Sequence, residues 1–180
     1  MSRIPSLGLL ISLLLVAPMW PDIATASPPL GQRAESKGVS TTSRFTITYP
    51  DHWIEASNHQ SAVVIYNQQP PAVGGGVFSS LYVIKTDAQV ENMSLREALQ
   101  GYRDGSSQSQ VRRIEEVTIN GRLGVRLWLI LAEEWDIGHS IVTYIPVSDR
   151  AVIYVVSYYY EENQFAEPAI LQVHDSLRLR

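Results

Sequence analysis

Cysteine is absent from this 180-residue sequence. Its absence excludes a disulfide framework, a thiolate metal site and a thiol nucleophile. It also excludes a lipid-modified cysteine, so we expect no lipid anchor on the processed chain. The folded domain must then be stabilised by its hydrophobic core.

Two further features are lacking, an excess of positive charge and a long apolar run. The sequence has 14 Lys and Arg against 18 Asp and Glu, a formal net charge of −4. Binding to a nucleic-acid backbone requires clustered Lys and Arg, so we expect no nucleic-acid partner. The apolar run Leu7–Val16 is shorter than the about 20 residues that span a bilayer. The processed protein is therefore not expected to be transmembrane.

Motifs of known catalytic sites are also missing. No Gly-x-Ser-x-Gly motif accompanies a histidine, so the signature of a serine hydrolase is absent. Gly74-Gly75-Gly76 lacks the Lys and Ser or Thr that follow in a phosphate-binding loop. Asp51 and His52 are adjacent at a predicted strand exit, where neighbouring side chains point in different directions. We interpret these two as turn residues and expect no enzyme.

The first 26 residues have the order of a signal peptide. Arg3 is followed by the apolar run Leu7–Val16 and then by Ala24-Thr25-Ala26, the small-x-small pattern at which signal peptidase cleaves. We therefore predict a signal peptide over residues 1–26 and export of the chain. Residues 27–43 are rich in Pro, Gly, Ser and Thr and predict a flexible leader. The folded domain is expected at residues 44–180.

The region from Arg122 to Tyr160 predicts the centre of the fold. Three segments there are rich in Val, Ile, Leu, Tyr and Trp, namely Arg122–Ala132, His139–Pro146 and Ala151–Tyr160. Asn120-Gly121 favours a type I′ turn, because both of its central positions need a positive φ. This turn joins the first segment to Val111–Ile119. The pattern predicts a four-stranded antiparallel meander.

Further strands and two helices are expected around this meander. The predicted strands are Phe45–Tyr49, Ala62–Tyr66 and Val77–Lys85. Ser94-Leu95-Arg96-Glu97 is a capping box that begins a helix. Near the C-terminus, a helical turn is expected to begin in Glu161–Phe165, and Pro168 fits the first position of a second turn. Val152–Val156 is apolar at every position, so both faces of that strand should be buried. We therefore predict an α+β fold, a three-layer α/β/α sandwich with a mainly antiparallel central sheet.

Glu133, Glu134, Asp136 and His139 form the densest group of potential metal ligands. They lie in the predicted loop between two strands of the meander. Carboxylates and an imidazole there could hold a divalent cation such as Ca²⁺, Mn²⁺ or Zn²⁺. The alternative is a solvated hairpin loop with exposed acids, since no defined ligand spacing is present.

Aromatic residues form a second group, which comprises Trp128, Trp135, Tyr154, Tyr158, Tyr159 and Tyr160. If some of these side chains reach the surface, they could form a protein-binding patch, because Tyr and Trp are effective anchors at interfaces. The alternative is that they fill the core between the sheet and the helices.

Several landmarks together resemble the PsbP family, the extrinsic lumenal proteins of photosystem II. They are Phe45-Thr46-Ile47-Thr48-Tyr49-Pro50 with Trp53, Ser94-Leu95-Arg96-Glu97, Ile119-Asn120-Gly121, Val152-Ile153-Tyr154-Val155-Val156, and Asp175-Ser176-Leu177-Arg178-Leu179. The resemblance covers about Arg44 to Leu179. Cyanobacterial members are typically lipoproteins, and the lack of cysteine separates this chain from them, which favours a paralogue or a different branch.

The resemblance implies a non-enzymatic accessory protein of the thylakoid lumen or periplasm. Its partner would be a membrane protein complex, with photosystem II or an assembly intermediate as the implied example. An alternative function is a small-ligand or metal-binding module of the cell envelope with the same fold, unrelated to photosynthesis.

Overall fold

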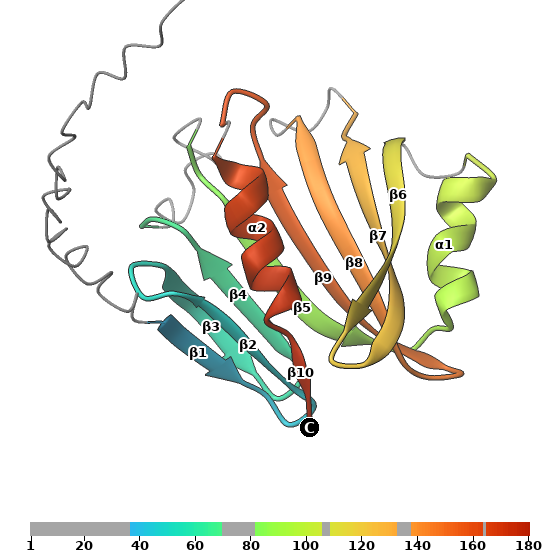
Figure 1. Ribbon diagram of the computed structural model, residues 1–180, viewed down its shortest axis with the longest axis horizontal. Coiled ribbons are helices and arrows are strands. Elements are labelled where there is room, and N and C mark those ends of the chain that lie inside the picture. Colours follow the sequence, from blue (N-terminus) through green and yellow to red (C-terminus); the bar gives the residue numbers. More distant parts are fainter. Residues whose placement is uncertain (1–36, 70–81, 106–108, 133–137, 164) are drawn as a thin grey trace, which may run out of the picture. The chain divides into compact units, whose positions relative to one another are not determined.

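The computed structural model describes residues 37–69, 82–105, 109–132, 138–163 and 165–180. The predicted signal peptide, most of the predicted leader, the first part of the predicted strand Val77–Lys85 and the acidic residues Glu133, Glu134 and Asp136 lie outside these ranges. The described residues form two antiparallel sheets and two helices (Figure 1).

The larger sheet has seven strands in the order β3-β4-β5-β9-β8-β7-β6. Their bounds are Ile54–His59 for β3, Ala62–Tyr66 for β4, Lys85–Glu91 for β5, Gln110–Ile119 for β6, Arg122–Ile130 for β7, His139–Ser148 for β8 and Ala151–Tyr159 for β9. All neighbouring strands are antiparallel. The predicted meander is confirmed as β6 to β9, and β9 lies at the centre of the sheet.

The turn between β6 and β7 has the predicted geometry. Asn120 has a φ of 52° and Gly121 a φ of 74°. Only residues that tolerate the left-handed region fit two successive positive φ angles, and Asn-Gly is the pair that suits a tight hairpin best. The turn fixes the register in which Ile119 faces Arg122.

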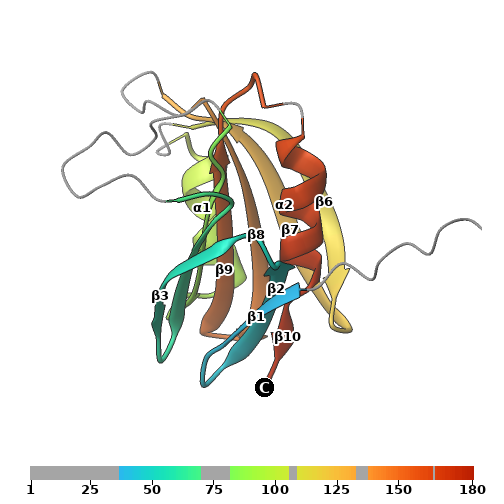
Figure 2. The same cartoon turned by 90° about the vertical axis from the view of Figure 1, so that its left-hand side faces the viewer.

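The smaller sheet corrects the predicted start of the domain. It consists of β1 (Lys37–Thr41), β2 (Phe45–Pro50) and β10 (Arg178–Leu179), in the order β1-β2-β10. Figure 2 shows these three strands side by side, with the C-terminus at the end of β10. The folded part therefore begins before Arg44, inside the predicted leader. Its strand was missed because Lys-Gly-Val-Ser-Thr has no apolar period.

Specific contacts hold β1 in place. Val39 faces Thr48 of β2, and the Asn58 side-chain amide of β3 donates a hydrogen bond of 3.1 Å to Ser40 Oγ. Ser40 itself is buried. These polar residues are part of the fold because they form hydrogen bonds to neighbouring strands. The local sequence does not reveal such long-range contacts.

In the described part of the predicted strand Val77–Lys85, residues 82–84 belong to no strand. Strand β5 begins at Lys85, where the predicted strand ends, and continues to Glu91. Its residues Lys85, Asp87 and Gln89 alternate with buried Thr86 and Ala88. The pattern was missed because few of these side chains are apolar, although each pairs with a neighbour on β4 and β9.

Both predicted helices are present. Helix α1 (Leu95–Arg103) has the predicted capping box, since the Ser94 backbone N–H donates to Glu97 Oε2 at 2.7 Å and Ser94 Oγ accepts from the Glu97 amide at 3.2 Å. Helix α2 (Ala166–Asp175) contains Pro168 in its first turn, where a missing N–H leaves no intrahelical bond unmade. No helix within the described residues is long and apolar enough to cross a membrane.

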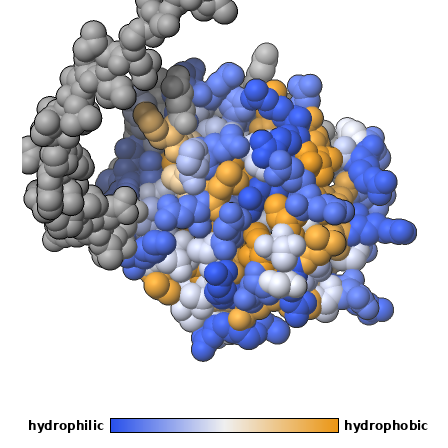
Figure 3. Space-filling model, viewed as in Figure 1, coloured by the Kyte–Doolittle hydropathy of each residue, from blue (hydrophilic) through white to orange (hydrophobic). Residues whose placement is uncertain are grey.

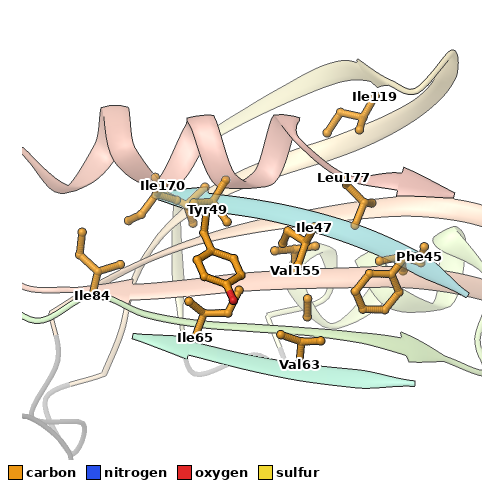
Figure 4. Packing of buried hydrophobic residues seen from close by; sticks show 14 of the residues in the cluster. Phe45, Ile47, Tyr49, Val63, Ile65, Ile84, Ile119, Val155, Ile170 and Leu177 are labelled. Atoms are coloured by element: carbon orange, nitrogen blue, oxygen red, sulfur yellow. The ribbon is translucent and has the colours of Figure 1, made fainter. Parts of the chain in front are cut away.

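The seven-stranded sheet buries apolar residues on both faces. One face packs against α2 and the smaller sheet through a cluster that includes Phe45, Ile47, Trp128, Ile145, Ile153, Val155, Ile170, Val173 and Leu177 (Figure 4). The other face packs against α1 through Ala98, Leu127, Leu129, Val142, Tyr144, Val152 and Val156. Successive residues of β7 and β9 alternate between the two clusters, as predicted for Val152–Val156. The mixed α+β class and the mainly antiparallel sheet are thus confirmed.

Strand β7 offers a direct test of this packing. Leu127 is fully buried, whereas Leu123 on the same strand is 59% exposed. Leu127→Ala should lower the free energy of unfolding by about 2–5 kcal/mol, because it removes buried apolar volume and leaves a cavity. Leu123→Ala is the matched control and should change it by less than about 0.5 kcal/mol. Chemical denaturation of both variants measures the difference, and equal losses would contradict the assigned register.

Candidate functional site

His139 is the member of the predicted metal group that the structure describes. It is the first residue of β8 and is buried. Its Nε2 lies 3.6 Å from Glu161 Oε2, and its ring centroid lies 5.6 Å from that of Tyr159. Among the described residues no three ligating side chains gather into a metal site. Because Glu133, Glu134 and Asp136 lie outside those ranges, the metal site stays a prediction.

Isothermal titration calorimetry with Ca²⁺, Mn²⁺ and Zn²⁺ tests this prediction. If the acidic loop binds a cation, Glu134→Ala and His139→Ala should each weaken binding by about 10–100-fold, the usual cost of disturbing a metal site. Asp149→Ala, in the turn at the other end of β8, is the matched control and should bind as the unmodified chain does. Absence of binding heat, or equal binding by all three variants, would refute the site.

His139 also lines a cleft beside the start of α2, which we name the β7–α2 cleft. Its lining residues are Arg112, Arg113, Trp128, Leu129, His139, Tyr159 and Glu167, and its volume is about 260 Å³. Strands β6, β7, β8 and β9 and helix α2 all contribute to it. The antiparallel pairing of these strands brings the residues together although they are far apart in the sequence.

Trp128 is held firmly in this cleft. Its indole Nε1 donates a 2.9 Å hydrogen bond to Glu167 Oε1, and the Arg113 guanidinium lies 3.7 Å from the centre of its ring. Arg113 also pairs with Glu115 at 2.6 Å and lies 3.9 Å from Glu167. These contacts fix the aromatic wall of the cleft through a cation–π interaction and a charge-assisted hydrogen bond.

The remaining polar groups supply donors. Burial raises the pKa of Tyr159, nearby Glu167 raises it further, and Arg112 partly opposes this effect. The phenol therefore stays protonated at neutral pH and can donate a hydrogen bond. Within the described residues the Arg112 side chain forms no ion pair. The cleft thus combines the Arg112 guanidinium, a phenol and a fixed indole, a set suited to binding an acidic or planar group.

Away from this cleft, a buried polar network crosses the sheet beneath α2. His174 of α2 places Nδ1 2.8 Å from Thr143 Oγ1 and Nε2 2.9 Å from Ser157 Oγ. Ser157 Oγ lies 2.6 Å from Thr86 Oγ1, and Arg126 Nε donates to Thr143 Oγ1 at 3.0 Å. Both imidazole nitrogens therefore have a partner, as a buried polar side chain requires.

This network has a structural role. Ser157 and His174 have the contact of a nucleophile and its base, but both are fully buried, so no substrate could reach the serine. Thr143 occupies the place at Nδ1 where a carboxylate would orient a catalytic histidine. The network was not predicted from the sequence. The sequence feature that could have indicated it is a polar residue at a core position, such as His174 between buried Ile170 and Leu177.

The predicted aromatic group divides between the two faces of the sheet. Tyr154 and Tyr158 pack against the cluster beneath α1, where the Tyr154 and Tyr144 ring centroids are 5.2 Å apart. Burial raises the pKa of Tyr144, Tyr154 and Tyr158, mainly by desolvation. Their rings fill space beside the helix. Trp128 and Tyr159 line the β7–α2 cleft, and Trp135 lies outside the described residues.

Two residues of the predicted turn behave as expected. His52 Nδ1 lies 3.9 Å from Asp51 Oδ1, too far for a hydrogen bond, and both side chains are exposed. Trp53 is buried in the cluster beneath α2, where it fills the edge of the core. The structure therefore gives no catalytic pair at this position.

Comparison with known proteins supports the fold alone. No protein-family model matches the sequence, and no curated protein matches it. The structure resembles the solution structure of cyanobacterial PsbP from Synechocystis sp. PCC 6803, with a TM-score of 0.50 and 10% identity over 87% of this chain and 99% of that chain. It also resembles a Pseudomonas aeruginosa protein of unknown function, described as a candidate regulator, with a TM-score of 0.50 and 15% identity over 80% and 97% of the two chains. The predicted PsbP-like fold is confirmed.

The buried network predicts how stability depends on pH. Burial lowers the pKa of His174 well below its usual value of 6.5, and the positive charge of Arg126 lowers it further. As the pH falls below about 6.5, the unfolded chain binds a proton that the folded chain does not, so the folded state loses stability. The melting temperature should therefore fall from pH 7 to pH 5.

A pair of variants isolates this effect. His174→Gln removes the titrating group, so its melting temperature should depend less steeply on pH over this range. Ile170→Ala, one turn earlier in α2, destabilises the same contact with the sheet but keeps His174, so it should retain the full dependence. Calorimetric melts at several pH values give both slopes. Equal slopes for the two variants would show that His174 does not cause the pH dependence.

Proposed function

We propose that this chain is an exported, non-catalytic accessory protein that binds a membrane protein complex in the thylakoid lumen or periplasm. Photosystem II, or an intermediate of its assembly, is the partner that the family resemblance implies. The observation that carries this proposal is the likeness to cyanobacterial PsbP, which extends over 87% of this chain and 99% of that one. It agrees with a resemblance drawn independently from landmarks at both ends of the domain.

The same likeness supports the finer prediction of a three-layer α/β/α sandwich. Helix α1 packs on one face of the seven-stranded sheet, and α2 packs on the other. The smaller sheet shares the layer of α2, because Phe45 and Ile47 of β2 belong to the same buried cluster as Ile170. A sheet covered on both faces leaves its edges, loops and clefts as the surfaces available to a partner.

The β7–α2 cleft is the surface that we assign to this binding. On the face drawn in Figure 3, apolar residues are interspersed with hydrophilic ones, and interfaces on such mixed surfaces include direct polar contacts. The cleft supplies such contacts through Arg112, His139 and Tyr159 around the fixed ring of Trp128. We propose that it receives an acidic or aromatic side chain of the partner.

The geometry argues for binding over catalysis. Ser157 and His174 are the pair that could act as a nucleophile and its base, but both are fully buried in the core. In the cleft, His139 lies beside Glu161 and the Tyr159 ring, an arrangement that orients the imidazole, and no described residue that lines the cleft is a serine, threonine or lysine. The polar groups of the cleft are therefore interpreted as recognition groups.

Co-purification tests the proposed function. The full chain with an affinity tag, expressed in its source organism and recovered from gently solubilised membranes, should carry a defined membrane protein complex identifiable by mass spectrometry. Arg112→Glu should lower recovery of that complex by about tenfold or more, because it reverses the charge at the centre of the contact.

Arg96→Glu is the matched control, since it makes the same charge change at an exposed position of α1. It should leave recovery unchanged. Recovery of no membrane complex by the unmodified chain would refute the accessory role. Equal recovery by both variants would keep the role but remove the β7–α2 cleft as the binding surface.

The cleft also supports the alternative function, a small-ligand module of the cell envelope. Its volume of about 260 Å³ is large enough for a small acid but below the usual range of drug-sized ligand sites. Native mass spectrometry of the exported protein distinguishes the two functions. A bound small molecule that Tyr159→Ala removes would favour the ligand module.

A further inference from the structure

Strand β6 is an open edge of the seven-stranded sheet. It pairs with β7 on its inner side, and no described strand pairs with its outer side. Its ten residues are mostly exposed, including Gln110, Arg112, Arg113, Ile114, Glu115, Glu116 and Thr118, and the Ile114 side chain is 60% exposed. A long edge with free backbone N–H and C=O groups is a template for another strand.

The sequence of β6 is complementary to itself. The central residue of this pattern is Ile114. Two arginines and a valine precede it, and two glutamates and a valine follow it, in the segment Val111–Val117. In an antiparallel pair of two such strands centred on Ile114, Arg113 of each copy faces Glu115 of the other. Opposite charges in directly facing positions stabilise a strand pair.

From this pattern we propose that two copies of the chain associate through antiparallel pairing of their β6 strands. The twofold axis passes between the two Ile114 residues, perpendicular to the sheet, and the seven-stranded sheet of one copy continues into that of the other. The partner is thus a second copy of this chain. A twofold axis requires such a self-complementary surface, and β6 supplies it.

The register of β6 on β7 places the paired side chains on defined faces. Arg113 and Glu115 face Trp128 and Arg126, on the side of α2, and Ile114 faces Leu127, on the side of α1. Arg113 and Glu115 already form a 2.6 Å ion pair within one strand. Two copies then form a closed ring of four alternating charges on one face, and the Ile114 side chains meet on the other.

One register alone is complementary. A shift of two residues in either direction sets Arg113 opposite its own copy, or Glu115 opposite its own copy, and facing like charges disfavour a strand pair. A shift of one residue would turn the charged side chains to the wrong face of the sheet. The irregularity between Val111 and Arg113 takes Arg112 out of the regular ladder, so the pairing rests on Arg113, Ile114 and Glu115. The charges on this edge therefore disfavour pairing with other strands but are complementary to a second copy in a single register.

Sedimentation velocity of the full chain tests the proposal. The unmodified chain should sediment as a dimer that dissociates on dilution and in high salt, because the paired charges are partly exposed. Arg113→Glu and Glu115→Arg should each weaken dimerisation by about tenfold or more, because each change creates two repulsive pairs by symmetry. Arg96→Glu on α1 controls for the change in net charge and should dimerise normally.

Mixing the two variants separates pairing from misfolding. A chain with Arg113→Glu and a chain with Glu115→Arg are each self-repulsive, but they complement each other at both facing pairs. An equimolar mixture should recover the dimer, and circular dichroism of each variant alone should match that of the unmodified chain.

Three results would overturn the proposal. They are a monomer at every soluble concentration of the unmodified chain, a dimer that neither variant weakens, and a mixture that stays monomeric. None of them depends on the membrane complex proposed above. Because Arg112 also lies on β6, Arg112→Glu is measured in the same sedimentation assay, so that loss of the dimer is distinguished from loss of the membrane complex.

Discussion

The burial of both faces of the central sheet is the constraint on which the rest of the structure depends. Alternate residues of β7 and β9 lie in two separate apolar clusters, for example Leu127 beneath α1 and Trp128 beneath α2. Neither face can meet water without exposing a large apolar area, so each needs a cover. Helix α1 contributes residues to one of these clusters, and α2 and the smaller sheet contribute residues to the other. The chain has no cysteine, so no disulfide can replace this burial.

The polar groups within this core add specificity to the packing. His174 of α2 reaches the hydroxyls of Thr143 and Ser157 on two adjacent strands, and Arg126 joins the same network and pairs with Asp175 at the end of α2. An apolar helix could slide over an apolar sheet at little cost, whereas a displaced His174 would leave buried groups without partners. The network therefore fixes the position of α2, and with it the position of Glu167 in the β7–α2 cleft.

The two surfaces assigned to binding lie on strands that also build the core. Arg113 takes part in both, since it stacks on Trp128 in the cleft and pairs with Glu115 along the exposed edge of β6. A partner bound in the cleft and a second copy bound at the edge would therefore both contact the same guanidinium. This arrangement links the two sites physically, because an arginine has five donors in a rigid fork and can serve two neighbours at once.

Local sequence patterns determined the capping box of α1, the Asn120-Gly121 turn, the four strands of the meander and the two-sided burial of Val152–Val156 in β9, because each depends on residues close together in the chain. Tertiary structure decided what depends on distant partners. Strand β1 has no apolar period and exists through its pairing with β2, and most of β5 was missed for the same reason. The β7–α2 cleft and the His174 network each join residues from four or more elements, so no local motif marks them. The self-complementary charges of β6 can be recognised in the sequence, but only the strand order of the described residues shows that they lie on an open edge.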